Sequence, residues 1–538
     1  MICGPFAACG VPQRDPNQGR AAEAAVETVA AEATEAAEIA EAAAAEAAEV
    51  TEATVAAAEA TVAAETEAAE VTEAAEIAEA AKAEAAVAAE SRGRPADSEA
   101  APEGRERPSL PEAASGPEVR DAARAAAIPA AGPDFPCTLL LKSGPPDLRV
   151  FHNGGELRPL GAEAGIRRFM LEAPGLVRLE AAGYTGKSLH TREIPGLLRD
   201  GQFQVKLENE GGMSERLQEL STGRQPKSAY FSPGGDRLFV PLLGQRGVDV
   251  FRFTGNAASA AAPKPGPKLV FEKRLAVPGS NAGGFVEAFC DGKRRELWVS
   301  NMEENRVHIF DLDSLEYKCS AGTGGIMPKA ITQSPAGDLT VVSNWLSRNI
   351  SVFDSATKER LALIPVDGTP RGMAFSPDGK TLYAAVFDGP LIAVIDMAAK
   401  KTAATYRLYE GAGAARHVIC SEGKLFVSDM YRGNVCILDA ASGKLLAAVR
   451  AGPNINTIVL SPDGKRIYAS SRGRNNPEDY TRPGPEFGAV YILRSADLSL
   501  EEKIWGRNQP TGLALSPDGR YMAFTDFLDD NLELYRID

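Results

Sequence analysis

Four basic side chains recur at comparable places in this 538-residue chain, each shortly after a glycine- or proline-containing turn: Lys227, Lys329, Arg371 and Arg416. Cations gathered in one place attract an anion by charge and by hydrogen bonding. Neutral Asn456 and Thr511 occupy the corresponding places in two later segments. The chemistry that this pattern offers is the binding of an anionic or polar ligand.

Polar residues also follow strand-like runs, at the points where those runs end: Asn301, Asn344, Asp388, Asp429, Arg472 and Asp526. If these ends share a face with the cations, Asn301, Asn344, Asp429 and Asp526 would orient a ligand by hydrogen bonds. A plainer interpretation stays open, because Asn and Asp suit turns and pair there with Lys and Arg.

A polar insertion follows one of these runs, from Arg472 through Gly488. A long loop in a compact repeat is more often functional than accidental. We expect it to form one wall of the binding site, with Arg472 and Arg474 contacting an anion. The alternative is a solvated extension of a hairpin.

Catalytic and metal-binding motifs are missing from the sequence. Its four histidines are widely spaced and its seven cysteines form no CxxC pair, so neither an HExxH centre nor a zinc ribbon is expected. Without a GxSxG elbow, a Walker loop or a CxxCH motif, we predict no catalytic residue, no cofactor and no resident metal. A lactonase-like, metal-dependent hydrolase stays open as an alternative. Its metal ion would be held by side chains that converge in the folded protein: Glu287, Asn301, Asn344, Asp429 and Asp526.

Composition separates an acidic segment from a nearly neutral body. The chain has 58 Lys and Arg against 73 Asp and Glu, a net charge of −15, and residues 21–90 alone hold 18 Glu against one Lys. The remainder is close to neutral, which excludes a dominant nucleic-acid footprint. Residues 21–90 are rich in Ala and Glu and predict a helical or disordered spacer, with a partner-binding coiled coil as the alternative. Residues 91–133 predict a linker.

Residues 1–20 resemble the end of a bacterial lipoprotein signal, since small residues precede Cys9 within Phe6–Gly10. If a hydrophobic segment precedes Met1, we expect lipidation of Cys9, a membrane tether and a place in the periplasm or cell envelope. If none precedes it, the protein would be cytoplasmic. No run of 18 apolar residues is present to span a bilayer.

Short alternating strands begin near residue 135. Turn residues such as Asn153-Gly154 separate the candidate strands at 138–142, 148–151, 167–171, 177–181, 188–193 and 202–207. This pattern indicates a small β-sandwich over 134–210. The order of strand, Asn153-Gly154, strand and Ala182-Gly183-Tyr184 resembles a PEGA-type surface domain, with any small immunoglobulin-like spacer as the alternative.

Residues 214–538 are built from repeats. SPxG turns place glycine at 235, 337, 379, 464 and 519, and degenerate versions at 292 and 423 complete the series. Proline at the second turn position and glycine at the fourth suit a tight hairpin. Four strand-like runs per unit, seven times over, predict a seven-bladed β-propeller. The loops after the second and fourth strands would share the face opposite these turns, where the four cations would gather.

The ends of the repeat region are complementary. The last repeat stops at its third strand, Asn531–Ile537, and a candidate fourth strand, Arg216–Leu220, precedes the first repeat. Pairing of 215–220 beside 531–537 would leave no open edge and would close the ring.

The runs Leu297–Asn301, Val341–Asn344 and Leu425–Asp429, with Thr369–Gly372 and Gln509–Gly512, resemble the YVTN-type, YncE-like bacterial propellers. The resemblance covers residues 214–538 and implies the propeller fold and an extracytoplasmic protein. It implies little about the ligand, because the same fold carries lactonases, amine dehydrogenase heavy chains and haem-binding domains.

The sequence thus predicts an all-β protein, with a seven-bladed β-propeller after a small β-sandwich and a low-complexity N-terminal segment. We expect a monomeric, non-enzymatic, extracytoplasmic binding protein that holds an anionic or polar ligand, a glycan or a protein at the strand 2–3 face. The lactonase-like hydrolase and a purely structural surface scaffold stay open as alternatives.

Overall fold

The computed structural model describes residues 135–163, 165–194, 202–254 and 267–537. Within these ranges the protein is all-β, with one 3-10 turn, η1 (Thr191–Glu193). The expected spacer at 21–90, the linker at 91–133 and the lipidation site Cys9 lie outside the described residues. No helix in the described ranges is long and apolar enough to cross a membrane.

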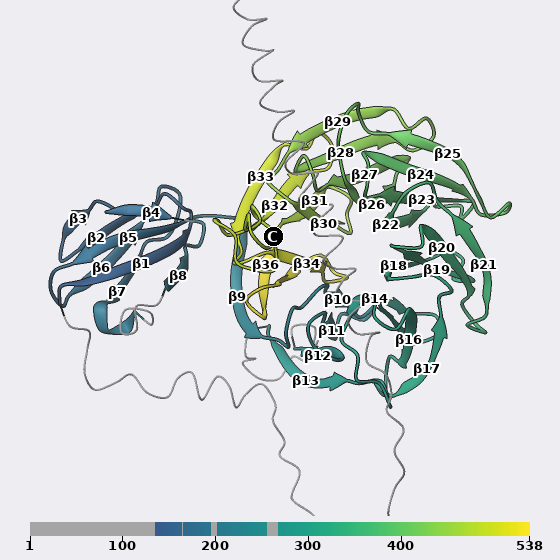
Figure 1. Ribbon diagram of the computed structural model, residues 1–538, viewed down its shortest axis with the longest axis horizontal. Coiled ribbons are helices and arrows are strands. Elements are labelled where there is room, and N and C mark those ends of the chain that lie inside the picture. Colours follow the sequence, from purple (N-terminus) through teal and green to yellow (C-terminus); the bar gives the residue numbers. More distant parts are fainter. Residues whose placement is uncertain (1–134, 164, 195–201, 255–266, 538) are drawn as a thin grey trace, which may run out of the picture. The chain divides into compact units, whose positions relative to one another are not determined.

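Eight strands between Cys137 and Lys206 form a β-sandwich of two four-stranded sheets, drawn in blue in Figure 1. The sheet orders are β4-β5-β1-β8 and β3-β2-β6-β7. Leu141, Phe169 and Val177 from the two sheets are buried in one core, as in packed sheets generally. The strands are β1 (Cys137–Gly144), β2 (Arg149–His152), β3 (Gly155–Leu157), β4 (Gly161–Glu163), β5 (Ile166–Leu171), β6 (Leu176–Glu180), β7 (Lys187–His190) and β8 (Gln202–Lys206).

The structure corrects one predicted strand of the sandwich. The strand expected at 188–193 ends at His190, where η1 begins. The Glu193 carboxylate accepts the His190 N–H at 2.7 Å, and the His190 ring accepts the Arg192 N–H. These capping bonds satisfy donors that a strand would pair with a neighbour. The sequence also misses the short strands β3 and β4.

Seven further four-stranded sheets form the blades of a propeller. Figure 1 shows the inner strands β10, β14, β18, β22, β26, β30 and β34 around the centre of the ring. Blades 1 to 3 consist of β10 (Tyr230–Phe231), β11 (Arg237–Pro241), β12 (Val248–Phe253) and β13 (Leu269–Leu275); β14 (Phe285–Asp291), β15 (Glu296–Asn301), β16 (Arg306–Asp311) and β17 (Tyr317–Gly322); β18 (Pro328–Gln333), β19 (Leu339–Asn344), β20 (Asn349–Asp354) and β21 (Arg360–Pro365).

The remaining four blades repeat this order, except that the last one borrows its outer strand from the start of the propeller sequence. They consist of β22 (Pro370–Phe375), β23 (Thr381–Val386), β24 (Leu391–Asp396) and β25 (Lys401–Arg407); β26 (Ala415–Ser421), β27 (Lys424–Asp429), β28 (Asn434–Asp439) and β29 (Leu445–Arg450); β30 (Ile455–Leu460), β31 (Arg466–Ser471), β32 (Ala489–Arg494) and β33 (Leu500–Trp505); β34 (Pro510–Leu515), β35 (Tyr521–Asp526), β36 (Asn531–Ile537) and β9 (Ser214–Ser221).

The SPxG turns join the first two strands of their blades. In each of the five, the glycine N–H donates to the serine carbonyl at 2.8 or 2.9 Å, and the glycine φ lies between 68° and 72°. Glycine enters this left-handed region without a Cβ clash. The degenerate turn of blade 2 differs, because Arg295 rather than Gly292 takes the positive φ, at 54°.

Ring closure follows the prediction. Strand β9 pairs antiparallel with β36, with Leu220 opposite Leu532 and Ser214 opposite Ile537. Side chains of blades 1 and 7, such as Phe251 and Leu534, share one buried cluster. The last blade therefore takes its outer strand from the segment that leads into the first blade, and the two blades share a common core.

Candidate functional site

The mouth of the propeller is organised by one hydrogen bond that recurs in every blade. The residue at the exit of the second strand, here called the exit residue, donates its N–H to the carbonyl just before the inner strand, over 2.8 to 3.1 Å. The inner strands therefore begin at the face where the second strands end, opposite the SPxG turns. The pairs are Leu243–Gln225, Met302–Gly284, Trp345–Met327, Phe387–Thr369, Met430–Ala414, Arg472–Asn454 and Phe527–Gln509.

Six of the seven exit residues are large and apolar, and we call them the apolar collar: Leu243, Met302, Trp345, Phe387, Met430 and Phe527. Phe527 is buried, whereas the other five keep part of their surface exposed. The seventh exit residue is Arg472, which is 8% exposed. The collar was not predicted from the sequence, although its residues follow the predicted second strands of the blades.

Hydroxyl groups on the second strands fix the inner strand of the following blade. Ser343 Oγ accepts the Ala330 N–H at 3.0 Å and donates to the Arg371 carbonyl at 2.8 Å. Ser300, Ser428 and Ser470 donate in the same way to the carbonyls of Lys329, Asn456 and Thr511, at 2.7, 3.0 and 3.2 Å. Each acceptor lies in a register shift of its inner strand, where a bulge re-aims the side chain.

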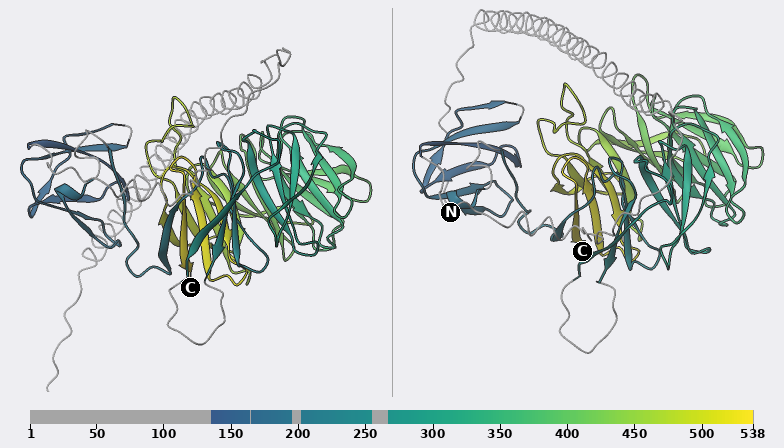
Figure 2. Two further views of the ribbon diagram at one scale, coloured as in Figure 1. Left: turned by 90° about the horizontal axis from the view of Figure 1, so that it is seen from below. Right: turned by 60° about the horizontal axis from the view of Figure 1, so that its bottom comes forward.

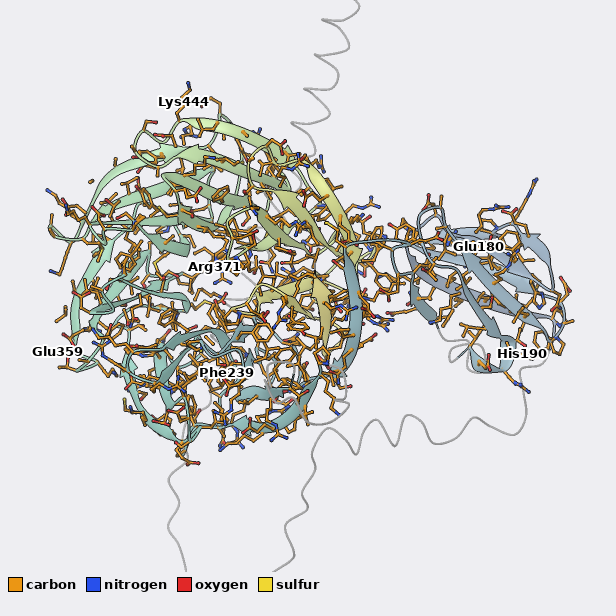
Figure 3. The ribbon with its side chains drawn as sticks, turned by 180° about the vertical axis from the view of Figure 1, so that it is seen from behind. Glu180, His190, Phe239, Glu359, Arg371 and Lys444 are labelled. Atoms are coloured by element: carbon orange, nitrogen blue, oxygen red, sulfur yellow. The ribbon has the colours of Figure 1, made fainter. Side chains whose placement is uncertain are left out.

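The bulged position carries three of the four predicted cations, and the fourth, Lys227, precedes the inner strand of blade 1. Lys329 and Arg371 are each 4% exposed and Arg416 is 8% exposed, and Lys227 is half-buried. Figure 3 shows Arg371 near the centre of the ring, whereas Glu359 and Lys444 lie at its outer edge. The structure thus brings these four side chains, each just before or at the start of an inner strand, to one ring at the mouth.

Aromatic rings of the collar hold the cations in pairs. The Trp345 ring has the Lys329 ammonium 5.5 Å from its centroid and the Arg371 guanidinium 5.9 Å from it. The Phe527 ring has Lys227 at 4.7 Å and Arg472 at 5.7 Å from its centroid. A cation over an aromatic face is attracted by the ring quadrupole. Each ring therefore fixes two positive charges.

Further contacts of the inner strands involve Arg371 and His417. The Arg371 guanidinium is 3.6 Å from the Glu287 carboxylate, which also accepts the Tyr230 hydroxyl at 3.1 Å. His417 Nδ1 accepts the Ile458 N–H at 3.2 Å. The glycine of the Thr369–Gly372 phrase is needed here, because a Cβ on Gly372 would lie 2.6 Å from His417 Cδ2.

The Asn and Asp residues that end the second strands bond within their own blades. Asn301 Nδ2 donates to the Gly283 carbonyl at 2.9 Å, and Asn344 Nδ2 donates to Ser351 at 2.8 Å. Asp429 accepts the Ala414 N–H at 2.9 Å and Asp526 accepts the Arg507 N–H at 2.8 Å. All four are fully buried. These bonds are those of turn-forming residues, and direct ligand contact by them stays a prediction.

The same residues bear on the channel-metal alternative. Burial raises the pKa of the Asp429 and Asp526 carboxyls, which disfavours the ionised form that a hard cation requires. Glu287 lies beside Arg371. Across the residues that the structure describes, no three His, Cys, Asp or Glu side chains are grouped to hold a metal ion.

Of the two insertion arginines that were predicted to contact an anion, one lies at the mouth. Arg472 Nε donates to Gln509 Oε1 at 3.1 Å, and Gln509 Nε2 donates to the Tyr480 carbonyl at 2.6 Å. Arg474 instead has a 68% exposed side chain and pairs with Glu486 at 3.3 Å. Figure 2 shows the insertion as a yellow hairpin projecting from the face opposite the C-terminal end.

Comparison with known proteins gives one extensive sequence similarity. No family model matches the chain. Antigen Lp49 of Leptospira interrogans is 35% identical over 372 residues, which cover 67% of this chain and 77% of Lp49. A chain in the crystal structure of the mitotic checkpoint complex is 17% identical with a TM-score of 0.48, covering 60% of this chain and 91% of that one. The match to Lp49 is longer than residues 214–538, so it extends beyond the propeller.

Proposed function

This chain belongs to the family of the leptospiral antigen Lp49, and from that premise we propose a non-enzymatic binding protein of the cell envelope that holds an anionic ligand at the mouth of its propeller. That the relative is an antigen supports a place in the envelope. A lipid anchor at Cys9 would supply the tether, and the insertion Arg472–Gly488 would form one wall of the site.

The observation that carries the proposal is the pairing of cations on the Trp345 and Phe527 rings. A cation held over an aromatic face keeps its position before a ligand arrives, so little side-chain entropy is lost on binding. The surroundings are largely shielded from water, which strengthens each ion pair. An anion at the mouth would be attracted by several fixed charges at once.

The strand-end residues serve this site indirectly. Asn301, Asn344 and Asp429 hold the turns that carry the exit residues Met302, Trp345 and Met430. Their amide and carboxylate groups would thereby set the shape of the collar, and the ligand would meet the collar and the cations.

The test uses a fluorescein-labelled decaglutamate peptide and the anisotropy of its label. Arg371→Glu should weaken binding by about tenfold or more, since losing one charged contact commonly costs over 1.4 kcal/mol. The matched control is Lys380→Glu, which makes the same charge change on an 83% exposed side chain directly after an SPxG turn. The difference between the variants should shrink in 1 M salt. Equal binding by both variants would refute the proposal.

A further inference from the structure

The sandwich is fixed to the last two blades by buried polar groups. Lys206, on β8, donates to the Trp505 carbonyl at 2.9 Å and pairs with Glu533, whose side chain is fully buried. The Tyr184 hydroxyl accepts the Trp505 indole N–H at 3.0 Å. Because a buried polar group that loses its partner costs free energy, these bonds hold the sandwich in place on blades 6 and 7.

A second buried lysine of the sandwich binds the insertion. Lys142, on β1, is 2% exposed. Its ammonium donates to the Gly484 carbonyl at 2.8 Å and to Asn508 Oδ1 at 2.6 Å, and it lies 4.9 Å from the centroid of the Phe487 ring. Burial lowers the pKa of Lys142 to about 8, so at neutral pH the side chain is largely protonated and its hydrogen bonds carry a charge.

Asn508 connects this lysine to the mouth. It precedes Gln509, whose carbonyl accepts the N–H of the exit residue Phe527 at 3.0 Å. The Gln509 side chain accepts from Arg472 Nε at 3.1 Å and donates to the Tyr480 carbonyl at 2.6 Å. The lysine therefore holds both the insertion itself and the segment of blade 7 that contacts Arg472.

The insertion depends on such contacts for its position. Between β31 and β32 the structure describes all of residues 472–488, and they form no strand or helix. A segment with few backbone bonds of its own opens easily unless other parts of the chain hold it. Besides the bond of Lys142 to Gly484, the sandwich touches the insertion at a second point, because a Cβ on Gly165 would lie 1.4 Å from the Pro485 carbonyl oxygen.

We propose that Lys142 is a positioning residue of the ligand site, which holds the insertion against the mouth and keeps Arg472 in place through the Asn508–Gln509 segment. The sandwich is thereby part of the binding apparatus rather than a spacer. The inference rests on the proposed function, because it concerns the wall and one cation of the same site. An arginine that is already held in place loses less conformational entropy when an anion binds.

The experiment measures binding of the fluorescein-labelled decaglutamate peptide to the full chain. Lys142→Met should weaken binding by about two- to tenfold, the cost of ordering one long side chain on binding. Gly165→Ala should weaken it similarly, because the added Cβ must displace Pro485, and it tests the inference should Lys142→Met fail to fold. The matched control is Tyr184→Phe, which removes a bond between the sandwich and Trp505 away from the insertion and should leave binding unchanged.

Two measurements separate positioning from a general loss of structure. If Lys142 acts through Arg472, Lys142→Met should weaken binding in the wild type but add nothing in Arg472→Gln, as expected of two groups that work as a unit. In Lys142→Met, amide hydrogen exchange should quicken in peptides from residues 474–487 and stay unchanged in the inner strands.

Binding and hydrogen exchange of Lys142→Met that match the wild type would overturn the inference, and the proposed anion site would stand if Arg371→Glu still weakens binding. An equal loss from Lys142→Met in the wild type and in Arg472→Gln would also overturn it, since the lysine would not act through the arginine. If decaglutamate binds the wild type and Arg371→Glu equally, the proposed function itself fails and the inference falls with it.

Discussion

Acidification should destabilise the protein through His417, which follows Arg416 on strand β26. Although His417 keeps some exposed surface, the surrounding blades exclude bulk water, and this burial, followed by the charges of Arg416 and Arg371, lowers its pKa to about 4. An unfolded histidine has a pKa of about 6.5. Between these values the unfolded chain binds more protons, so stability falls as pH drops. The stabilisation is fully present above pH 6.5 and is lost progressively towards pH 4.

The size of the effect follows from the two pKa values. Between pH 7.5 and pH 5, the difference in protonation costs the folded state about 2 kcal/mol. His417→Gln removes this site, so its loss of stability between the same two pH values should be smaller by about that amount. The carboxyl groups and His308 titrate equally in the wild type and in His417→Gln. The difference between these two proteins therefore isolates the contribution of His417.

Proton NMR of the imidazole groups measures the pKa itself. The chain has four histidines, and the resonance missing from His417→Gln identifies His417. Its midpoint should lie near pH 4 and should rise in Arg371→Gln, because one neighbouring positive charge is gone. A midpoint near 6.5, or a midpoint that Arg371→Gln leaves unchanged, would refute the gathering of cations around this ring.

Three further outcomes test the fold and the positioning of the site. Deleting residues 1–222, which removes β9, should lower the melting temperature by about 10 °C or more relative to deleting 1–133. Each kcal/mol of lost stability lowers the melting temperature by about 2–4 °C in a domain of this size. Equal melting temperatures of the two truncated proteins would contradict closure by β9. Lys206 pairs with the fully buried Glu533, so Lys206→Met should cost about 3–5 kcal/mol in chemical denaturation. The double variant with Glu533→Leu should recover most of that loss, and a double variant as unstable as the single one would argue against the pair. Ser343→Ala should cost about 1–3 kcal/mol by the same assay, because its hydroxyl joins two blades; an unchanged midpoint would show that the bond is dispensable.

Much of the propeller could be predicted because its repeat is local. Four consecutive residues of each SPxG turn are enough to predict a hairpin. The fourth strand of the last blade could be predicted at Arg216–Leu220, because this run resembles the fourth strand of another repeat. Because the repeats can be aligned, the equivalent positions of Lys329 and Arg371 in successive blades could also be predicted. The wrong strand prediction at 188–193 in the sandwich also has a local cause. The capping bonds of Glu193 compete with strand pairing, and the alternation of residue types does not reveal these bonds.

The details of the mouth depend on contacts that the sequence does not state. Asn344 and Asp429 look the same in sequence whether they face a ligand or close a turn, and only the folded blade shows their partners. Arg472 and Arg474 are two residues apart, yet one reaches Gln509 and the other pairs with Glu486. The pairing of Lys206 with Glu533 spans 327 residues and joins strand β8 of the sandwich to strand β36 of the last blade.

The most direct test of the account is a crystal structure of the protein soaked with a triiodinated isophthalate, a rigid aromatic dianion whose iodine atoms are located by anomalous scattering. The anion-binding mouth predicts iodine peaks inside the collar, with a carboxylate at the Lys329–Arg371 pair on Trp345. Iodine peaks confined to the SPxG-turn face or to the outer strands, with none at the mouth, would contradict it.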